Sequence, residues 1–193
     1  MPGRKAEGTV SRVVNGIDVG SVSVVGLGYV GLTVASCLAS KGFRVIGIDV
    51  DRERVEAVNS GVPPIHEPGL ERLMRKSLRR GTLKATSDYG ELSETDLTFI
   101  TVGTPSLPDG SIDLRYIVEA SRSIGRALRS KEGRHLVVVK STVVPGTTER
   151  VVAPIVAEAS GKDLGDSLLV AVNPEFLSEG SAVRDMMKPD RIV

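Results

Sequence analysis

Short apolar runs alternate along this chain with segments whose apolar residues recur at helical spacing. The runs predict strands at 22–25, 44–49, 83–86, 97–102, 136–140 and 167–172. The intervening segments predict helices from the glycine-rich stretch at 26–31 to Gly42, after Asp51, over about 67–80, from Asp113, and from Thr147 with a kink at Pro154. Strands that alternate with helices imply right-handed crossovers. We therefore predict an α/β fold, a doubly wound parallel sheet with helices on both faces.

The first predicted strand leads into Gly26, Gly28 and Gly31, which have GxGxxG spacing. In a dinucleotide-binding turn the first glycine permits the tight turn and the second lets the main chain approach a pyrophosphate. The third lets the helix pack close to the strand. The pyrophosphate then lies against free N–H groups at the helix N-terminus. Because a strand precedes the glycines and an amphipathic helix follows them, we predict a Rossmann-type cofactor domain; the alternative is a βαβ unit that binds no nucleotide.

Asp49 ends the second predicted strand, where a carboxylate accepts hydrogen bonds from the adenosine ribose and repels a 2′-phosphate. Arg52 and Arg54 follow and could meet such a phosphate, but Asp49 and Asp51 lie nearer the strand end. The sequence therefore favours NAD over NADP as the cofactor.

Length, charge and patterning narrow the class of protein. At 193 residues one domain is expected, with 40% hydrophobic residues and a formal net charge of +1, which predicts no nucleic-acid partner. No apolar stretch is long enough for a membrane span and no apolar leader follows the basic N-terminus, so we expect no membrane partner and a cytoplasmic location. Residues 1–20, polar and basic, are predicted to be a flexible extension, and residues 21–193 the cofactor domain.

Cysteine and histidine usage does not indicate a reactive or metal centre in this chain. Cys37, the single cysteine, falls on the apolar face of the first predicted helix and is expected to be a buried structural thiol. His66 and His135 lack metal-ligand spacing, so no metal site is predicted.

Polar residues follow several predicted strands. Ligands in open α/β sheets lie at the carboxyl ends of the strands, which makes Asp49, Thr104, Thr142 and Glu175 site candidates. Thr104 and Thr142, taken singly, are better explained as ordinary turn or cap residues, and it is their joint position with the other candidates that favours a site.

Six motifs in one order carry a family resemblance. They are GLGYVG at 26–31, PIHEPG at 64–69, VGTP at 102–105, KSTVVPG at 140–146, NPEFL at 173–177 and KPDRIV at 188–193. Together they resemble the UDP-glucose/GDP-mannose dehydrogenase family from about Val22 to Val193. The last stretch is most similar to UDP-glucose 6-dehydrogenases; GDP-mannose and UDP-N-acetylmannosamine dehydrogenases are the alternatives.

The resemblance implies oxidation of the C6 alcohol of UDP-glucose to the carboxylate of UDP-glucuronate by two NAD in succession, through a cysteine thiohemiacetal and thioester. It implies NAD contacts at Gly26, Leu27, Gly28, Tyr29, Val30, Gly31, Asp49, Arg54, Val102, Thr104, Thr142 and Glu179. Glu175 would be the general acid or base, with Thr142 near the catalytic water. Glu175, Phe176 and Leu177 would lie near the sugar nucleotide.

The family's nucleophilic cysteine, together with an active-site lysine and asparagine, belongs to a central helix and a C-terminal domain that have no counterpart here. We therefore expect this chain to be an inactive piece of a longer, homodimeric enzyme, one that supplies precursors for surface polysaccharide or glycan, with Val193 inside a strand. The alternative is an NAD-binding module without catalysis.

Overall fold

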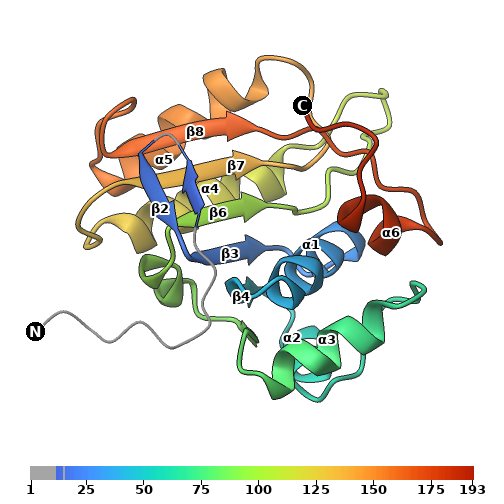
Figure 1. Cartoon of the computed structure of the whole chain (residues 1–193). Helices are drawn as coiled ribbons and strands as arrows, with labels where there is room; N and C mark the ends of the chain where they lie inside the picture. Colours follow the sequence, from blue (N-terminus) through green and yellow to red (C-terminus); the bar gives the residue numbers. More distant parts are fainter. Residues whose placement is uncertain (1–11, 15) are drawn as a thin grey trace, which may run out of the picture.

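A computed structural model describes residues 12–14 and 16–193, which are built around one parallel sheet (Figure 1). Its strands are β3 (Ser21–Val25), β4 (Arg44–Ile48), β5 (Leu83–Thr86), β6 (Leu97–Ile100), β7 (His135–Val139) and β8 (Leu168–Val172). Their order is β5-β4-β3-β6-β7-β8, and every neighbouring pair is parallel. The chain winds outward from β3 to one edge and then from β6 to the other, which confirms the predicted doubly wound sheet.

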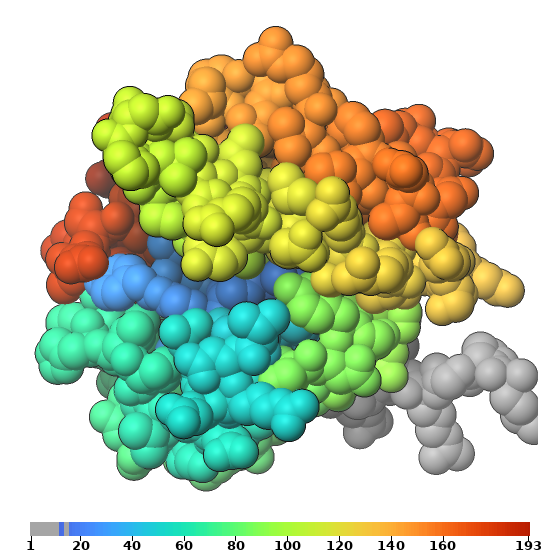
Figure 2. Space-filling view, turned by 180° about the vertical axis from the view of Figure 1, so that it is seen from behind, coloured from blue at the N-terminus to red at the C-terminus, as the bar shows by residue number. Residues whose placement is uncertain are grey.

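Helices cover both faces of the sheet. One face carries α1 (Tyr29–Ser40), α2 (Arg52–Asn59), α3 (Leu70–Arg79) and α6 (Ala182–Met187). The other carries the 3₁₀-helix η1 (Tyr89–Glu94), α4 (Arg115–Leu128), the π-helix η2 (Thr148–Val152) and α5 (Ala153–Ser160). Seen from behind, α4 and α5 form the yellow-green to orange mass of Figure 2, and only a narrow blue band separates it from the cyan residues of α2. None of the helices in the described part of the chain is long and apolar enough to cross a membrane.

The strands are buried on both faces because their side chains alternate between two apolar cores. In β7, Leu136 and Val138 join the core under α1, whereas Val137 and Val139 join the core under α4. All five residues of β3 and of β7 are buried. This two-sided burial explains why the strands are continuous apolar runs in the sequence.

The predicted helix starts are largely observed. Asp51 is the N-cap of α2, and its side chain accepts a hydrogen bond of 3.2 Å from the N–H of Arg54. The helix predicted from Thr147 begins with the π-helix η2, which meets α5 beside Pro154. Proline has no N–H, so regular α-helical bonding cannot pass through this position.

The structure differs from the sequence-based predictions at both ends. Within the predicted flexible extension, β1 (Arg12–Val14) and β2 (Ile17–Val19) form an antiparallel hairpin. Ile17 and Val19 are buried in the same core as Leu136 and Val138, so this part of the extension packs on the sheet. Residues 1–11 and 15 of that extension lie outside the described residues. The strand expected at Val193 is not observed: residues 191–193 have no regular secondary structure.

Candidate functional site

The glycine turn between β3 and α1 has the three properties that its spacing predicts. Gly26 has a φ of +94°, in the left-handed region that favours glycine. A Cβ at Gly31 would lie 1.8 Å from the carbonyl oxygen of Gly26, so only glycine lets α1 pack this close. A Cβ at Gly28 would meet nothing within 4 Å, which leaves open space beside the backbone.

That open space lies at the start of α1. Gly28 is the N-cap of α1 and makes no side-chain capping hydrogen bond, so the first N–H groups of the helix face an uncapped end. An anion held there would meet the positive end of the helix dipole. The turn therefore fits the pyrophosphate of a dinucleotide.

Asp49 is fixed beside the turn, just after β4. Its side chain is only 4% exposed, and its Oδ2 accepts hydrogen bonds from Leu27 N (2.6 Å) and Arg54 Nη1 (3.0 Å). Arg54 also lies 3.6 Å from Asp51 Oδ2. Two carboxylates therefore neutralise Arg54, and this end of the site favours a ribose diol over a 2′-phosphate.

A cavity of about 430 Å³ lies beside Thr86, whose carbonyl accepts a hydrogen bond from the N–H of Asp49. Arg52, Val55 and Thr86 are among its lining residues. Arg52 thus faces this cavity, while Arg54 is engaged with Asp49.

Hydrogen bonds join the loops that follow β6 and β7. Thr104 Oγ1 donates to the carbonyl of Thr142 (2.8 Å), and Ser141 Oγ donates to the carbonyl of Val102 (2.7 Å). Thr101 Oγ1 donates to the carbonyl of Gly26 (2.8 Å) and so ties the loop after β6 to the glycine turn. The two predicted threonines therefore meet between the ends of β6 and β7, next to the point between β3 and β6 where the winding of the sheet reverses.

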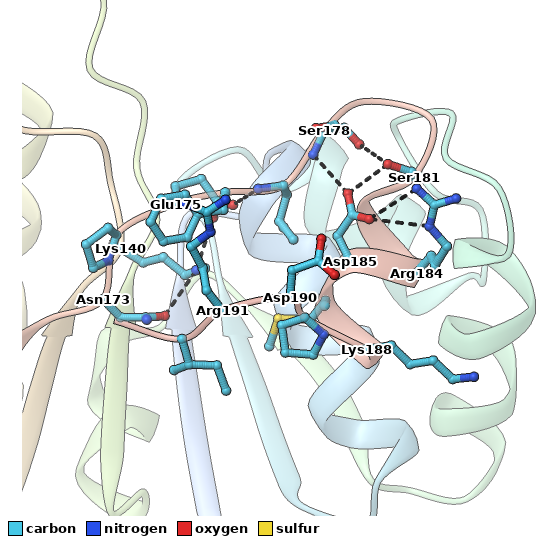
Figure 3. Close-up of a pocket in the computed structure, with 16 residues that line it drawn as sticks. Lys140, Asn173, Glu175, Ser178, Ser181, Arg184, Asp185, Lys188, Asp190 and Arg191 are labelled. Atoms are coloured by element: carbon cyan, nitrogen blue, oxygen red, sulfur yellow. Dashed lines mark hydrogen bonds and ion pairs between the residues drawn. The ribbon is translucent and has the colours of Figure 1, made fainter.

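Glu175 lies at the carboxyl end of β8 with both carboxylate oxygens in defined places (Figure 3). Its Oε1 accepts a hydrogen bond from the N–H of Leu177, and its Oε2 lies 3.2 Å from Lys140 Nζ. Lys140 also donates to Asn173 Oδ1 (3.1 Å). The side chains of Lys140 and Glu175 are only 6% and 13% exposed, so the pair is largely removed from water.

The Lys140–Glu175 pair lines a cavity of about 530 Å³ that continues under α6. Phe176 and Arg191 lie on its wall, with the guanidinium of Arg191 over the Phe176 ring at 5.5 Å from the centroid. Phe176 is 50% exposed, so its ring is available to a ligand. Charged, amide and aromatic side chains therefore line this cavity together.

The site is extended. The strands β4 and β8, which precede Asp49 and Glu175, are four strand spacings apart in the sheet, or roughly 19 Å. The two are therefore at opposite ends of one edge, with the glycine turn and the two threonines between them. A ligand that reaches from Asp49 towards Glu175 must be long, as a dinucleotide is.

The remaining predicted residues contribute in different ways. The side chain of Leu27 is fully buried, and those of Val30 and Val102 pack on the two cores, so these three residues offer a ligand mainly their backbone. Glu179 is exposed on the segment between β8 and α6. Tyr29 donates a hydrogen bond through its hydroxyl to Glu67.

Sequence reasoning missed the roles of Lys140 and Glu67, although both lie in motifs that it identified. The predicted burial of Cys37 is confirmed: its thiol is inaccessible, and burial raises its pKa to about 11. His135 is buried with its Nε2 2.8 Å from Thr98 Oγ1, a partner that the sequence did not reveal. Within residues 12–14 and 16–193, no group of three or more His, Cys, Asp or Glu side chains could hold a metal ion.

Comparison with known proteins identifies the same family. Residues 20–193 match the UDP-glucose/GDP-mannose dehydrogenase family, NAD binding domain. The UDP-glucose 6-dehydrogenase AglM of Haloferax volcanii is 50% identical over 172 residues, and a GDP-mannose 6-dehydrogenase of Pseudomonas syringae pv. tomato is 47% identical over 173. Each alignment covers 89% of this chain and 40% of the relative, so the chain spans about two fifths of the length of these relatives.

Solved structures agree with this assignment. A ternary complex of GDP-mannose dehydrogenase from Pseudomonas aeruginosa superposes with a TM-score of 0.87 at 45% identity, covering 89% of this chain and 39% of that one. A UDP-glucose dehydrogenase from Pyrobaculum islandicum gives 0.85 at 52% identity, covering 94% and 41%. The cofactor prediction of NAD is confirmed by the family match. The chain belongs to the UDP-glucose/GDP-mannose dehydrogenase family and contains its NAD-binding domain.

Proposed function

We propose that this chain is the cofactor-binding part of an enzyme that oxidises UDP-glucose to UDP-glucuronate. The proposal rests above all on the position of Glu175. Its side chain is only 13% exposed, lies just beyond the end of β8 and lines a cavity. The glycine turn and Asp49 would hold two NAD molecules in succession, and each would supply the hydride acceptor for one of the two oxidations.

The residues of the glycine turn would bind and orient the cofactor. The N-terminus of α1 would hold the pyrophosphate above Gly28, and Asp49 would accept a hydrogen bond from the adenosine ribose. The loops that carry Thr104 and Thr142 would border the nicotinamide end, since they follow the strands beside the turn.

Glu175 would act as a general base in the final hydrolysis. Its Oε1 is held by the backbone of Leu177, and Lys140 fixes the other oxygen, so the carboxylate has one orientation towards the cavity. From this position it would take a proton from the water that attacks a thioester. The cysteine of that thioester must come from outside this chain, because Cys37 is buried with a raised pKa.

The choice of sugar nucleotide rests on the sequence from Glu179 to Val193, which is most similar to UDP-glucose 6-dehydrogenases. The relatives named as UDP-glucose and GDP-mannose dehydrogenases are 50% and 47% identical, so GDP-mannose is the second candidate substrate.

The proposal is tested on the complete reading frame that contains this chain. NAD reduction is followed with UDP-glucose, GDP-mannose and UDP-N-acetylmannosamine in turn. We expect kcat/KM for UDP-glucose to exceed the other two by at least about a hundredfold, about 2.7 kcal/mol. A preference for GDP-mannose would refute the substrate, and reduction with none of the three would favour a binding module.

The role of Glu175 is tested by Glu175→Gln, with the exposed Glu158→Gln as the matched control. Loss of a general base is expected to lower kcat by about 10² to 10⁴. The KM values for UDP-glucose and NAD should change little. A variant that keeps normal turnover would exclude Glu175 from the hydrolysis.

A further inference from the structure

The segment of residues 173–181, between β8 and α6, has no helix or strand of its own. We call it the β8–α6 strap. It carries Glu175 and Glu179, the two carboxylates assigned above to the catalytic and cofactor ends of the site. Something outside the strap must therefore set its position relative to the glycine turn.

Glu67 makes that connection. Its side chain accepts hydrogen bonds from the Tyr29 hydroxyl at the start of α1 and from the N–H of Gly180 at the end of the strap (2.8 Å). The N–H of Val183 in α6 lies 3.4 Å from the other carboxylate oxygen, and Gly180 N also lies 3.0 Å from the Tyr29 hydroxyl. One carboxylate thus joins the glycine turn, the strap and α6.

Glu67 is itself held firmly. The residue is 5% exposed, and its carbonyl accepts the N–H of Leu70, the first residue of α3. Leu70 and Met74 of α3 are fully buried in the core under α1. The carboxylate therefore projects from the loop directly before α3, next to a helix that is anchored in the core.

The charge state suits this function. Partial desolvation acts to raise the pKa of Glu67, but the hydrogen bonds from Tyr29 and from the backbone of Gly180 and Val183 outweigh it and hold the pKa below the ordinary value of 4.5. Hydrogen bonds to a carboxylate are about twice as strong as those between neutral groups. At neutral pH the strap is thus held by charge-assisted bonds.

We infer that Glu67 is a positioning residue that couples the glycine turn to the catalytic strap. It acts through Tyr29 and Gly180, so that the cofactor-binding backbone and the carboxylates of Glu175 and Glu179 keep one mutual geometry. This inference deepens the proposed function and rests on it for the roles of those two carboxylates.

The test compares Glu67→Gln with Glu71→Gln. Glu71 is the matched control because it lies four residues further along the chain, in the first turn of α3, is exposed, and forms an ion pair with Arg75 (2.8 Å). In the 193-residue chain, amide hydrogen exchange of peptides covering 176–183 is expected to quicken at least tenfold in Glu67→Gln, while β3 and β7 keep their protection. Tyr29→Phe should give a smaller increase in the same peptides, and it remains informative if Glu67→Gln does not fold.

NAD titration provides the second readout. We expect Glu67→Gln to weaken NAD binding at least fivefold and Glu71→Gln to leave it unchanged. The inference would be overturned if the strap peptides exchanged no faster in Glu67→Gln than in Glu71→Gln, or if exchange quickened equally in the strap, β3 and β7. It would also be overturned if the strap peptides exchanged faster while NAD affinity stayed unchanged. If the unsubstituted chain does not bind NAD, the proposed function fails, whereas the exchange comparison still decides whether Glu67 positions the strap.

Discussion

Two alanine substitutions in the glycine turn should separate folding from cofactor binding. A Cβ at Gly31 would lie 1.8 Å from the carbonyl oxygen of Gly26 and 2.5 Å from Thr101 Oγ1, so α1 must move away from β3. A Cβ at Gly28 would meet nothing, and Gly28 has a φ of −72°, which alanine adopts freely. The same glycine-to-alanine change should therefore destabilise the fold much more at position 31 than at position 28.

The expected magnitudes follow from these contacts. Overpacking against backbone costs about 3 kcal/mol, offset by up to about 1 kcal/mol from the better helix propensity of alanine. We expect Gly31→Ala to lower the free energy of unfolding by about 2 to 3 kcal/mol and Tm by about 4 to 12 °C. Because alanine is a poorer N-cap than glycine, Gly28→Ala should lower the free energy of unfolding by no more than about 1 kcal/mol. Its methyl group would occupy the space for the pyrophosphate, so NAD affinity should fall at least tenfold, about 1.4 kcal/mol.

Urea unfolding followed by circular dichroism and calorimetric titration with NAD measure the two effects on the same samples. The unsubstituted chain is the reference for both. The reasoning would be refuted if Gly28→Ala lost as much stability as Gly31→Ala, or if it bound NAD as well as the reference.

Three further predictions concern buried or paired groups. Cys37, with its pKa raised by burial to about 11, should react with a thiol reagent at about pH 8 only after denaturation; rapid labelling of the native chain would contradict its burial. Burial lowers the pKa of His135 from 6.5 to about 3, so the unfolded chain binds a proton that the folded chain excludes. Stability should then fall by up to about 1.4 kcal/mol per pH unit as pH drops from 6.5 towards 3, and His135→Gln should lose this slope in urea midpoints. Asp49→Ala should weaken NAD binding and remove the nearer of the two carboxylates from Arg54, so the ratio of NAD to NADP affinity should fall in parallel titrations; an unchanged ratio would exclude Asp49 as the selecting group.

The sequence predicted features that depend on neighbouring residues. The strands, the N-cap at Asp51 and the glycine turn all carry signals within a few positions, and each is found in the structure. The hairpin β1–β2 was missed because its strands have three residues each, too few for a clear period. The Asn15-Gly16 dipeptide in the sequence is a known hairpin signal that could have identified it.

Contacts between distant segments could not be predicted from one sequence. Lys140 and Glu175 come from the ends of different strands, and the Glu67–Gly180 hydrogen bond spans 113 positions. Neither pair has a local pattern, because the sheet order and the path of the strap bring them together. His135 gained its partner Thr98 in the same way, from the adjacent strand.

The most direct test of the central claim is the number of NADH molecules formed for each UDP-glucose consumed by the complete reading frame. We predict a yield near two, since a primary alcohol becomes a carboxylate through two hydride transfers. A yield near one would contradict the two-step oxidation, and no NADH from UDP-glucose would contradict the proposed function itself.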